Sequence, residues 1–272
     1  MSVPAPTALP AAAQQLAARL LASRPLAHGQ MQVIGLAAPP GSGKSTLAAC
    51  MVARARQQGL RAATLSLDDV YLPRRQRQQL AARVHPLQAT RGPPGSHDLA
   101  LALSVITTLR NGQACALPRF DKLADERLPA TQWPQAGAGL QLLVLEGWML
   151  GVGPQDPAAL AMPVNALERE HDADGRWRQW CNQRLAQDYP ALWQQIDWLC
   201  ALQPPDWDCV LGWRIEQEQR LAASQGRSGM DAAAVARFLQ HLERVGRHAL
   251  ATLPAIAALC LQLDAQRRVV EG

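Results

Sequence analysis

The chain has 272 residues, of which 48% are hydrophobic, and a formal net charge of +5. This length suits one α/β domain or at most two small ones, and the apolar content excludes a chain that is disordered throughout. The mildly basic charge selects no partner, and the sequence has neither a run of five basic residues nor a nucleic-acid-binding motif, so we expect no nucleic-acid partner.

Residues 11–24 have the pattern of an amphipathic helix without acidic residues, which is also typical of transit peptides. Because only a short link separates them from the first apolar segment, we expect residues 1–30 to contribute a helix that packs onto the domain. No apolar run approaches the roughly 18 residues that span a membrane. The six cysteines contain no C-x-x-C pair, which argues against a zinc site or a disulfide framework and favours the cytoplasm.

Short apolar segments alternate with helical patterns along the rest of the chain. We predict strands at residues 31–37, 61–67, 140–147, 196–202 and 256–263. We predict helices at residues 45–58, 97–110, 176–187, 207–224 and 231–250. This alternation predicts the α/β fold class, with a five-stranded parallel sheet flanked by helices on both faces. The long segments 70–98 and 111–139 follow strand ends, where such sheets bind ligands, and are predicted to form the acceptor side of a site within a single domain, 1–272.

A phosphate-binding loop follows the first predicted strand. In GSGKST (41–46), the glycines allow backbone N–H groups to surround phosphate oxygens, Lys44 reaches the outer phosphates and the Ser45 hydroxyl binds Mg²⁺. Ala38 replaces the usual first glycine, which we expect to be tolerated if its φ is negative. The motif predicts a P-loop NTPase fold with ATP and Mg²⁺ as cofactors, held by Pro40, Gly41, Ser42, Gly43, Lys44, Ser45 and Thr46.

The class of P-loop protein follows from other motifs. None of the three asparagines precedes a lysine, so the guanine-reading N-K-x-D motif is absent, and no LSGGQ-like transporter signature is present. Small-molecule kinases remain, and these need a base near the acceptor hydroxyl and an acid for magnesium. Asp68 and Asp69 follow the second predicted strand, and Glu146 ends the third. Only two of the 27 basic residues are lysines, Lys44 and Lys122, which suggests that both positions require a compact ammonium group.

Several motifs together resemble the D-glycerate 3-kinases, which are P-loop kinases related to uridine kinase, phosphoribulokinase and bacterial pantothenate kinase. The matching segments are LAAPPGSGKST, SLDDVYLP, RGPPGSHD (91–98), LPRFDK (117–122), LEGWMLG (145–151), VNALE (164–168), GWRIEQE (212–218) and GMDAAAVARFLQHLERV (229–245). The resemblance runs from about Met31 to Asp264. The phosphate loop is general to the class, whereas EGWMLG and RGPPGSHD are specific to the glycerate kinase branch.

The resemblance implies that phosphate passes from ATP to the 3-hydroxyl of D-glycerate. It implies that Asp68 is the base, that Glu146 holds the metal together with Ser45, and that Arg214, with Lys44, is catalytic. Arg214 and Arg220 would belong to a mobile lid at residues 207–228. The acceptor would contact Asp69, Tyr71, Arg91, His97, Asp98, Arg119, Asp121 and Lys122.

Other functions stay open at this point. LADER (123–127) is shorter than the corresponding segment of the family, so a kinase of the same fold could act on pantothenate, a nucleoside or another sugar acid. RGPPGSHD and LPRFDK also resemble segments of pantothenate kinases. An ATP-binding regulatory protein without transfer activity is a further alternative. The sequence does not indicate an oligomeric state.

Overall fold

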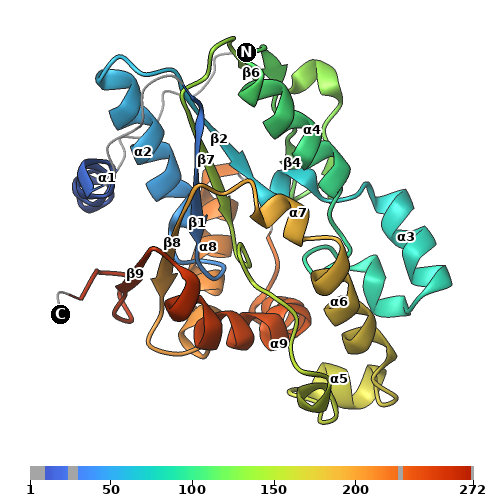
Figure 1. Cartoon of the computed structure of the whole chain (residues 1–272). Coiled ribbons are helices and arrows are strands. Elements are labelled where there is room, and N and C mark those ends of the chain that lie inside the picture. The colour runs from blue at the N-terminus through green and yellow to red at the C-terminus, as the bar shows by residue number, and fades with distance from the viewer. Residues whose placement is uncertain (1–9, 24–29, 226–228, 271–272) are drawn as a thin grey trace.

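A five-stranded parallel sheet forms the centre of the computed structural model, which describes residues 10–23, 30–225 and 229–270. The strand order is β2-β7-β1-β8-β9 (Figure 1). The bounds are β1 Gln32–Ala37, β2 Ala62–Ser66, β7 Leu142–Gly147, β8 Trp198–Gln203 and β9 Leu259–Gln262. The predicted fold class, a parallel sheet between helices, is confirmed.

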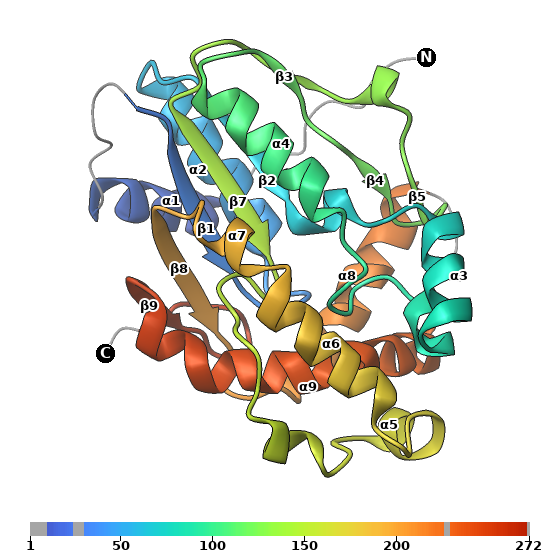
Figure 2. The same cartoon turned by 45° about the vertical axis from the view of Figure 1, so that its right-hand side comes forward.

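Helices cover both faces of this sheet (Figure 2). One face packs against α1 (Ala11–Ser23) and α2 (Lys44–Gln57), and the other against α4 (Leu99–Arg110), α7 (Pro190–Trp193) and α9 (Ala232–Ile256). The two faces alternate along β1, because Ile34 joins the cluster around α2 whereas Val33 joins the cluster around α9. No helix in the described ranges is long and apolar enough to cross a membrane.

The segments between the core strands contain more regular structure than the sequence predicts. Segment 70–98 includes α3 (Arg74–Arg83), and segment 111–139 pairs β3 (Cys115–Ala116) with β6 (Gln135–Ala136) and β4 (Phe120–Asp121) with β5 (Glu126–Arg127). The remaining helices are α5 (Ala166–His171), α6 (Arg176–Gln187) and α8 (Cys209–Gln225).

The boundary between the last helix and the last strand differs from the prediction. Helix α9 continues to Ile256 instead of ending at residue 250, and β9 begins only at Leu259. The helix continues because Leu253 is buried in the core, and Pro254 lies in the last turn, where its missing N–H removes only one hydrogen bond.

Gly246 gives a first test of the packing. A Cβ atom at this position of α9 would lie 1.9 Å from the Trp207 ring, whereas nothing lies within 4 Å of a Cβ at Gly212, an exposed position inside α8. We expect Gly246→Ala to destabilise the protein by about 1–3 kcal/mol through overpacking. Gly212→Ala should be neutral or should stabilise the protein by up to about 1 kcal/mol. Urea unfolding of both variants checks this, and equal effects would contradict the close packing of α9 on Trp207.

Candidate active site

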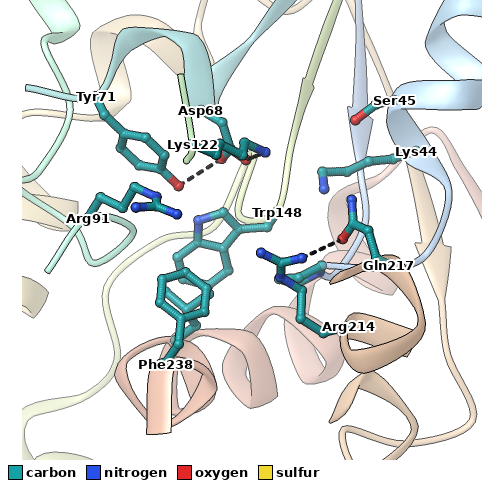
Figure 3. Close-up of a pocket in the computed structure, with 12 residues that line it drawn as sticks. Lys44, Ser45, Asp68, Tyr71, Arg91, Lys122, Trp148, Arg214, Gln217 and Phe238 are labelled. Carbon is teal, nitrogen blue, oxygen red and sulfur yellow. Dashed lines mark hydrogen bonds and ion pairs between the residues drawn. The ribbon is translucent and has the colours of Figure 1, made fainter. Parts of the chain in front are cut away.

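A cavity lies at the edge of the sheet where β1, β2 and β7 end (Figure 3). Ligands bind at this edge in open α/β sheets. The cavity is lined by Pro40, Lys44, Ser45, Asp68, Tyr71, Arg91, Lys122, Trp148, Arg214, Gln217, Phe238 and Leu242. Eight of these twelve residues are among those predicted from the sequence.

The phosphate loop has the backbone that its glycines allow. Gly41 and Gly43 have φ angles of 78° and 89°, in the left-handed region that favours glycine. Ala38 has no positive φ, and its N–H donates to the Gly147 carbonyl over 3.1 Å. The condition under which we expect alanine to be tolerated, a backbone without a positive φ, is therefore met.

The register of the sheet brings Glu146 next to the phosphate loop. β7 lies between β1 and β2, so Glu146 pairs with Leu36 on one side and Ser66 on the other. The Ser45 hydroxyl donates to Glu146 Oε1 over 2.8 Å, and Lys44 Nζ lies 3.9 Å from Glu146 Oε2. Oε2 is buried and has no hydrogen-bond partner among the described residues. A hydroxyl and a carboxylate with an unused oxygen fit a magnesium ion, which prefers oxygen ligands.

Asp68 points into the cavity from the 3₁₀ turn that follows β2. Ser66 Oγ accepts a hydrogen bond from the Asp68 N–H and so fixes this turn. The Asp68 carboxylate accepts from Lys122 Nζ at 2.6 Å and from the Tyr71 hydroxyl at 2.8 Å. Burial alone raises the pKa of Asp68, but Lys122 and Lys44, with these hydrogen bonds, outweigh it and hold the pKa well below its usual range. Asp68 is therefore ionised at neutral pH.

Asp69, the next residue, does not line the cavity. Its carboxylate accepts from the Phe120 N–H and from Arg119, each over 3.1 Å. This contact ties the turn after β2 to β4. Asp69 and Arg119 do not line the cavity, and their predicted contact with the acceptor stays a prediction.

The ionisation of Asp69 gives a second testable expectation. Burial raises the pKa of Asp69 to about 6, despite the opposing effect of Arg119, whereas the ordinary value is 3.8. The folded state thus binds this proton more tightly than the unfolded chain. The resulting stabilisation is complete below the unfolded pKa and is lost as the pH rises through the folded one.

Asp69→Asn cannot ionise, so we expect it to gain stability relative to the wild type between about pH 4 and about pH 7. Denaturant unfolding of both proteins at several pH values in this range measures the difference. A stability difference that does not change with pH would contradict the raised pKa.

The acceptor side of the cavity contains two cations, Lys122 and Arg91. Lys122 follows β4 and is held against Asp68, which raises the pKa of the lysine even though burial opposes this. Arg91 donates to Asp125 at 2.6 Å and lies 5.9 Å from the Phe120 ring centroid. Asp125, in LADER, also binds the buried Arg77 at 2.8 Å. The segment that departs from the family pattern therefore anchors an arginine of the cavity.

Three further residues with a predicted acceptor role do not line the cavity. His97 Nδ1 lies 2.7 Å from the Tyr189 hydroxyl, and the His97 ring centroid lies 4.7 Å from that of Tyr71. Burial lowers the pKa of His97 to about 3, so the ring is neutral. Asp98 caps α4 and binds Arg127, and Asp121 accepts from two backbone N–H groups of the next turn. Their contact with the acceptor stays a prediction.

Helix α8 contributes Arg214 to the cavity. Arg214 forms an ion pair with Glu218 and donates to Gln217 over 3.2 Å. It is buried, and its guanidinium carbon lies 6.0 Å from the Phe238 ring centroid. Arg220 lies further along α8 and is exposed. Among the described residues it forms an ion pair only with Glu216. Part of the predicted lid, residues 226–228, falls outside the described residues.

Four cavity residues were not predicted from the sequence: Trp148, Gln217, Phe238 and Leu242. A fifth missed residue, Arg267, lies behind the loop and donates to the Gly41 carbonyl over 2.7 Å and to the Trp213 carbonyl over 3.3 Å. It also pairs with Glu216 of α8 at 2.6 Å. The matching motifs EGWMLG and VARFLQHLERV contain Trp148 and Phe238, which was the only signal for them.

The chain is similar to known kinases. Residues 33–154 match the phosphoribulokinase/uridine kinase family. The chain is 31% identical over 232 residues to "Uncharacterized kinase mug58" of Schizosaccharomyces pombe, covering 82% of each protein. It is 30% identical over 208 residues to the chloroplastic D-glycerate 3-kinase of Arabidopsis thaliana, covering 73% of this chain but only 43% of that protein. A solved D-glycerate 3-kinase from Cryptococcus neoformans is 25% identical, with a TM-score of 0.74 over 96% of this chain and 98% of that one.

The fold and the site define a P-loop kinase, an ATP-dependent phosphotransferase with an alcohol group as acceptor. Within that class, the chain belongs to the D-glycerate 3-kinase family, as the sequence motifs predicted.

Proposed function

We propose that this enzyme transfers the γ-phosphoryl group of Mg·ATP to the 3-hydroxyl of D-glycerate, giving 3-phosphoglycerate. The observation that carries the proposal is the arrangement of charges around the cavity. The phosphate loop supplies Lys44 on one side, and Lys122 and Arg91 lie on the other with Asp68 between them (Figure 3). A small acceptor with a hydroxyl and a carboxylate matches these charges, because its hydroxyl can bind Asp68 and its carboxylate can bind the cations beyond it.

Each residue has one task in the transfer. Asp68, ionised at neutral pH, accepts the proton of the hydroxyl as its oxygen bonds to the γ-phosphorus and the bond to ADP breaks. Lys44 and Arg214 bind the oxygens of the transferred group and stabilise its charge. When bound by Ser45 and Glu146, magnesium supplies further charge neutralisation. Arg91 binds the acceptor carboxylate and orients the hydroxyl toward Asp68.

The side chains that line the cavity support a small, anionic acceptor. The acceptor half of the cavity is closed by Tyr71 and Trp148, both of which are buried, and by the side chain of Arg91. A nucleoside would place an uncharged base against Lys122 and Arg91, and it has no carboxylate for either of them to bind. The relatives named as D-glycerate 3-kinases support the same choice.

ADP release by the purified protein with Mg·ATP tests the proposal. D-glycerate is compared with L-glycerate, pantothenate and uridine, and the product is identified. We expect stimulation by D-glycerate with formation of 3-phosphoglycerate. Stimulation by another compound alone would retain the reaction class but overturn the substrate.

A further inference from the structure

Trp148 carries a hydrogen-bond donor that has no acceptor. The residue follows β7 directly, is 3% exposed and lines the cavity, but its Nε1 has no hydrogen-bond partner among the described residues. Three other tryptophans are paired: the Nε1–H of Trp133 donates to the Leu128 carbonyl over 2.8 Å, that of Trp193 to the Val152 carbonyl over 3.0 Å and that of Trp213 to the Ala265 carbonyl over 2.7 Å. A buried indole N–H usually finds such a partner, because leaving it unpaired is unfavourable.

The indole nitrogen is on the acceptor side of the cavity. In Figure 3 the edge of the ring that carries it faces Arg91, and the opposite edge faces Arg214. The neighbouring cations already have partners, since Arg91 binds Asp125 at 2.6 Å and Lys122 binds Asp68 at 2.6 Å. On the acceptor side of the cavity, the Trp148 N–H is thus a hydrogen-bond donor without a partner among the described residues.

We propose that Trp148 is a specificity-determining residue whose Nε1–H donates a hydrogen bond to the carboxylate of the acceptor. An indole N–H can only donate, so it selects an acceptor oxygen. A carboxylate presents two such oxygens, one for Arg91 and the other for the indole. The rigid ring, packed in the core beside Leu150 and Met149, fixes the position of that second oxygen. This inference rests on the proposed function, because it needs a carboxylate acceptor.

Trp148→Phe removes the N–H and keeps most of the ring. We expect the KM for D-glycerate to rise about 10- to 100-fold, as for a lost hydrogen bond to a charged group, with the KM for ATP unchanged. Trp177→Phe is the matched control, because Trp177 Nε1 is also buried and has no partner in the described part of the chain, but Trp177 lines a separate cavity with His241 and Glu168. It should leave both KM values unchanged. An unchanged KM for D-glycerate in Trp148→Phe, or an equal rise in both variants, would overturn the inference.

Nuclear magnetic resonance of the wild-type protein with ¹⁵N-indole-labelled tryptophan observes the bond directly. The chain has eight tryptophans, and the indole signal missing from Trp148→Phe assigns Trp148. D-glycerate should shift that signal downfield, whereas glycerol, which lacks the carboxylate, should not.

The two proposals fail in different ways. If D-glycerate is not phosphorylated but pantothenate is, and pantothenate shifts the Trp148 signal, the substrate is wrong and the role of Trp148 holds. If the Trp148 signal does not move with any carboxylate acceptor at saturating concentration, the role of Trp148 is wrong, whatever the enzyme phosphorylates.

Discussion

Replacement of Lys44 by alanine is expected to lower kcat by about 10³-fold, the effect of removing one preorganised group that stabilises the transferred charge. Lys44 is the first residue of α2, is 8% exposed and lies 3.9 Å from Glu146. Arg214 lines the same cavity, but it belongs to α8 and not to the phosphate loop, so we do not expect it to replace the ammonium of Lys44. Steady-state kinetics with the best acceptor measures the loss, and urea unfolding checks that the variant is folded.

Lys44→Arg is the informative companion variant. The protein uses arginine at nearly every other basic position, so a retained lysine suggests that size and shape matter here. We expect the arginine variant to stay at least about tenfold below the wild type, because the planar guanidinium does not fit the space of a compact ammonium. Full activity of Lys44→Ala would refute the role in phosphate binding, and full activity of Lys44→Arg would show that charge alone suffices.

Replacement of Asp68 by asparagine is expected to lower kcat by about 10²–10⁴-fold, the usual contribution of a general base. The KM for ATP should stay near the wild-type value, because Asp68 contacts Lys122 and Tyr71 and not the phosphate loop. The amide is similar in size and can still accept from the Tyr71 hydroxyl. Kinetics with both substrates varied therefore separates loss of chemistry from loss of binding.

Asp69→Asn is the matched control for this experiment. The two residues are adjacent, but Asp69 binds Arg119 and the Phe120 N–H and does not line the cavity. We expect its effect on kcat to be much smaller than that of Asp68→Asn. If Asp69→Asn proves the more damaging change, the assignment of the base within the pair is wrong.

The phosphate loop could be predicted because its chemistry is contained in six consecutive residues. Gly41 and Gly43 are needed for their φ angles, and Lys44 and Ser45 for their side chains, so the sequence pattern specifies the local structure. The position of Glu146 beside the loop could be predicted for a related reason. Glu146 ends an apolar strand, and parallel strands end at one edge of the sheet.

Fewer residues on the acceptor side of the cavity could be predicted from the sequence. Trp148 and Phe238 are apolar, and nothing in their spacing separates a ring that lines a cavity from one that fills the core. Conversely, the charges of Asp69 and Asp98 suggested substrate contacts, although both pair with arginines of segment 111–139. Which partner a carboxylate meets depends on the folding of β4 and β5, short strands that no pattern predicted.

Both lysines of the chain line the same cavity. These 272 residues therefore contain no lysine side chain elsewhere. Reagents that acylate amines will modify the protein inside its own cavity, and coupling through amines to a sensor chip or a dye will obstruct ligand binding. Attachment through another group, such as an introduced thiol or an affinity tag, preserves the site. Conversely, protection of Lys122 from acylation gives a simple measure of acceptor occupancy.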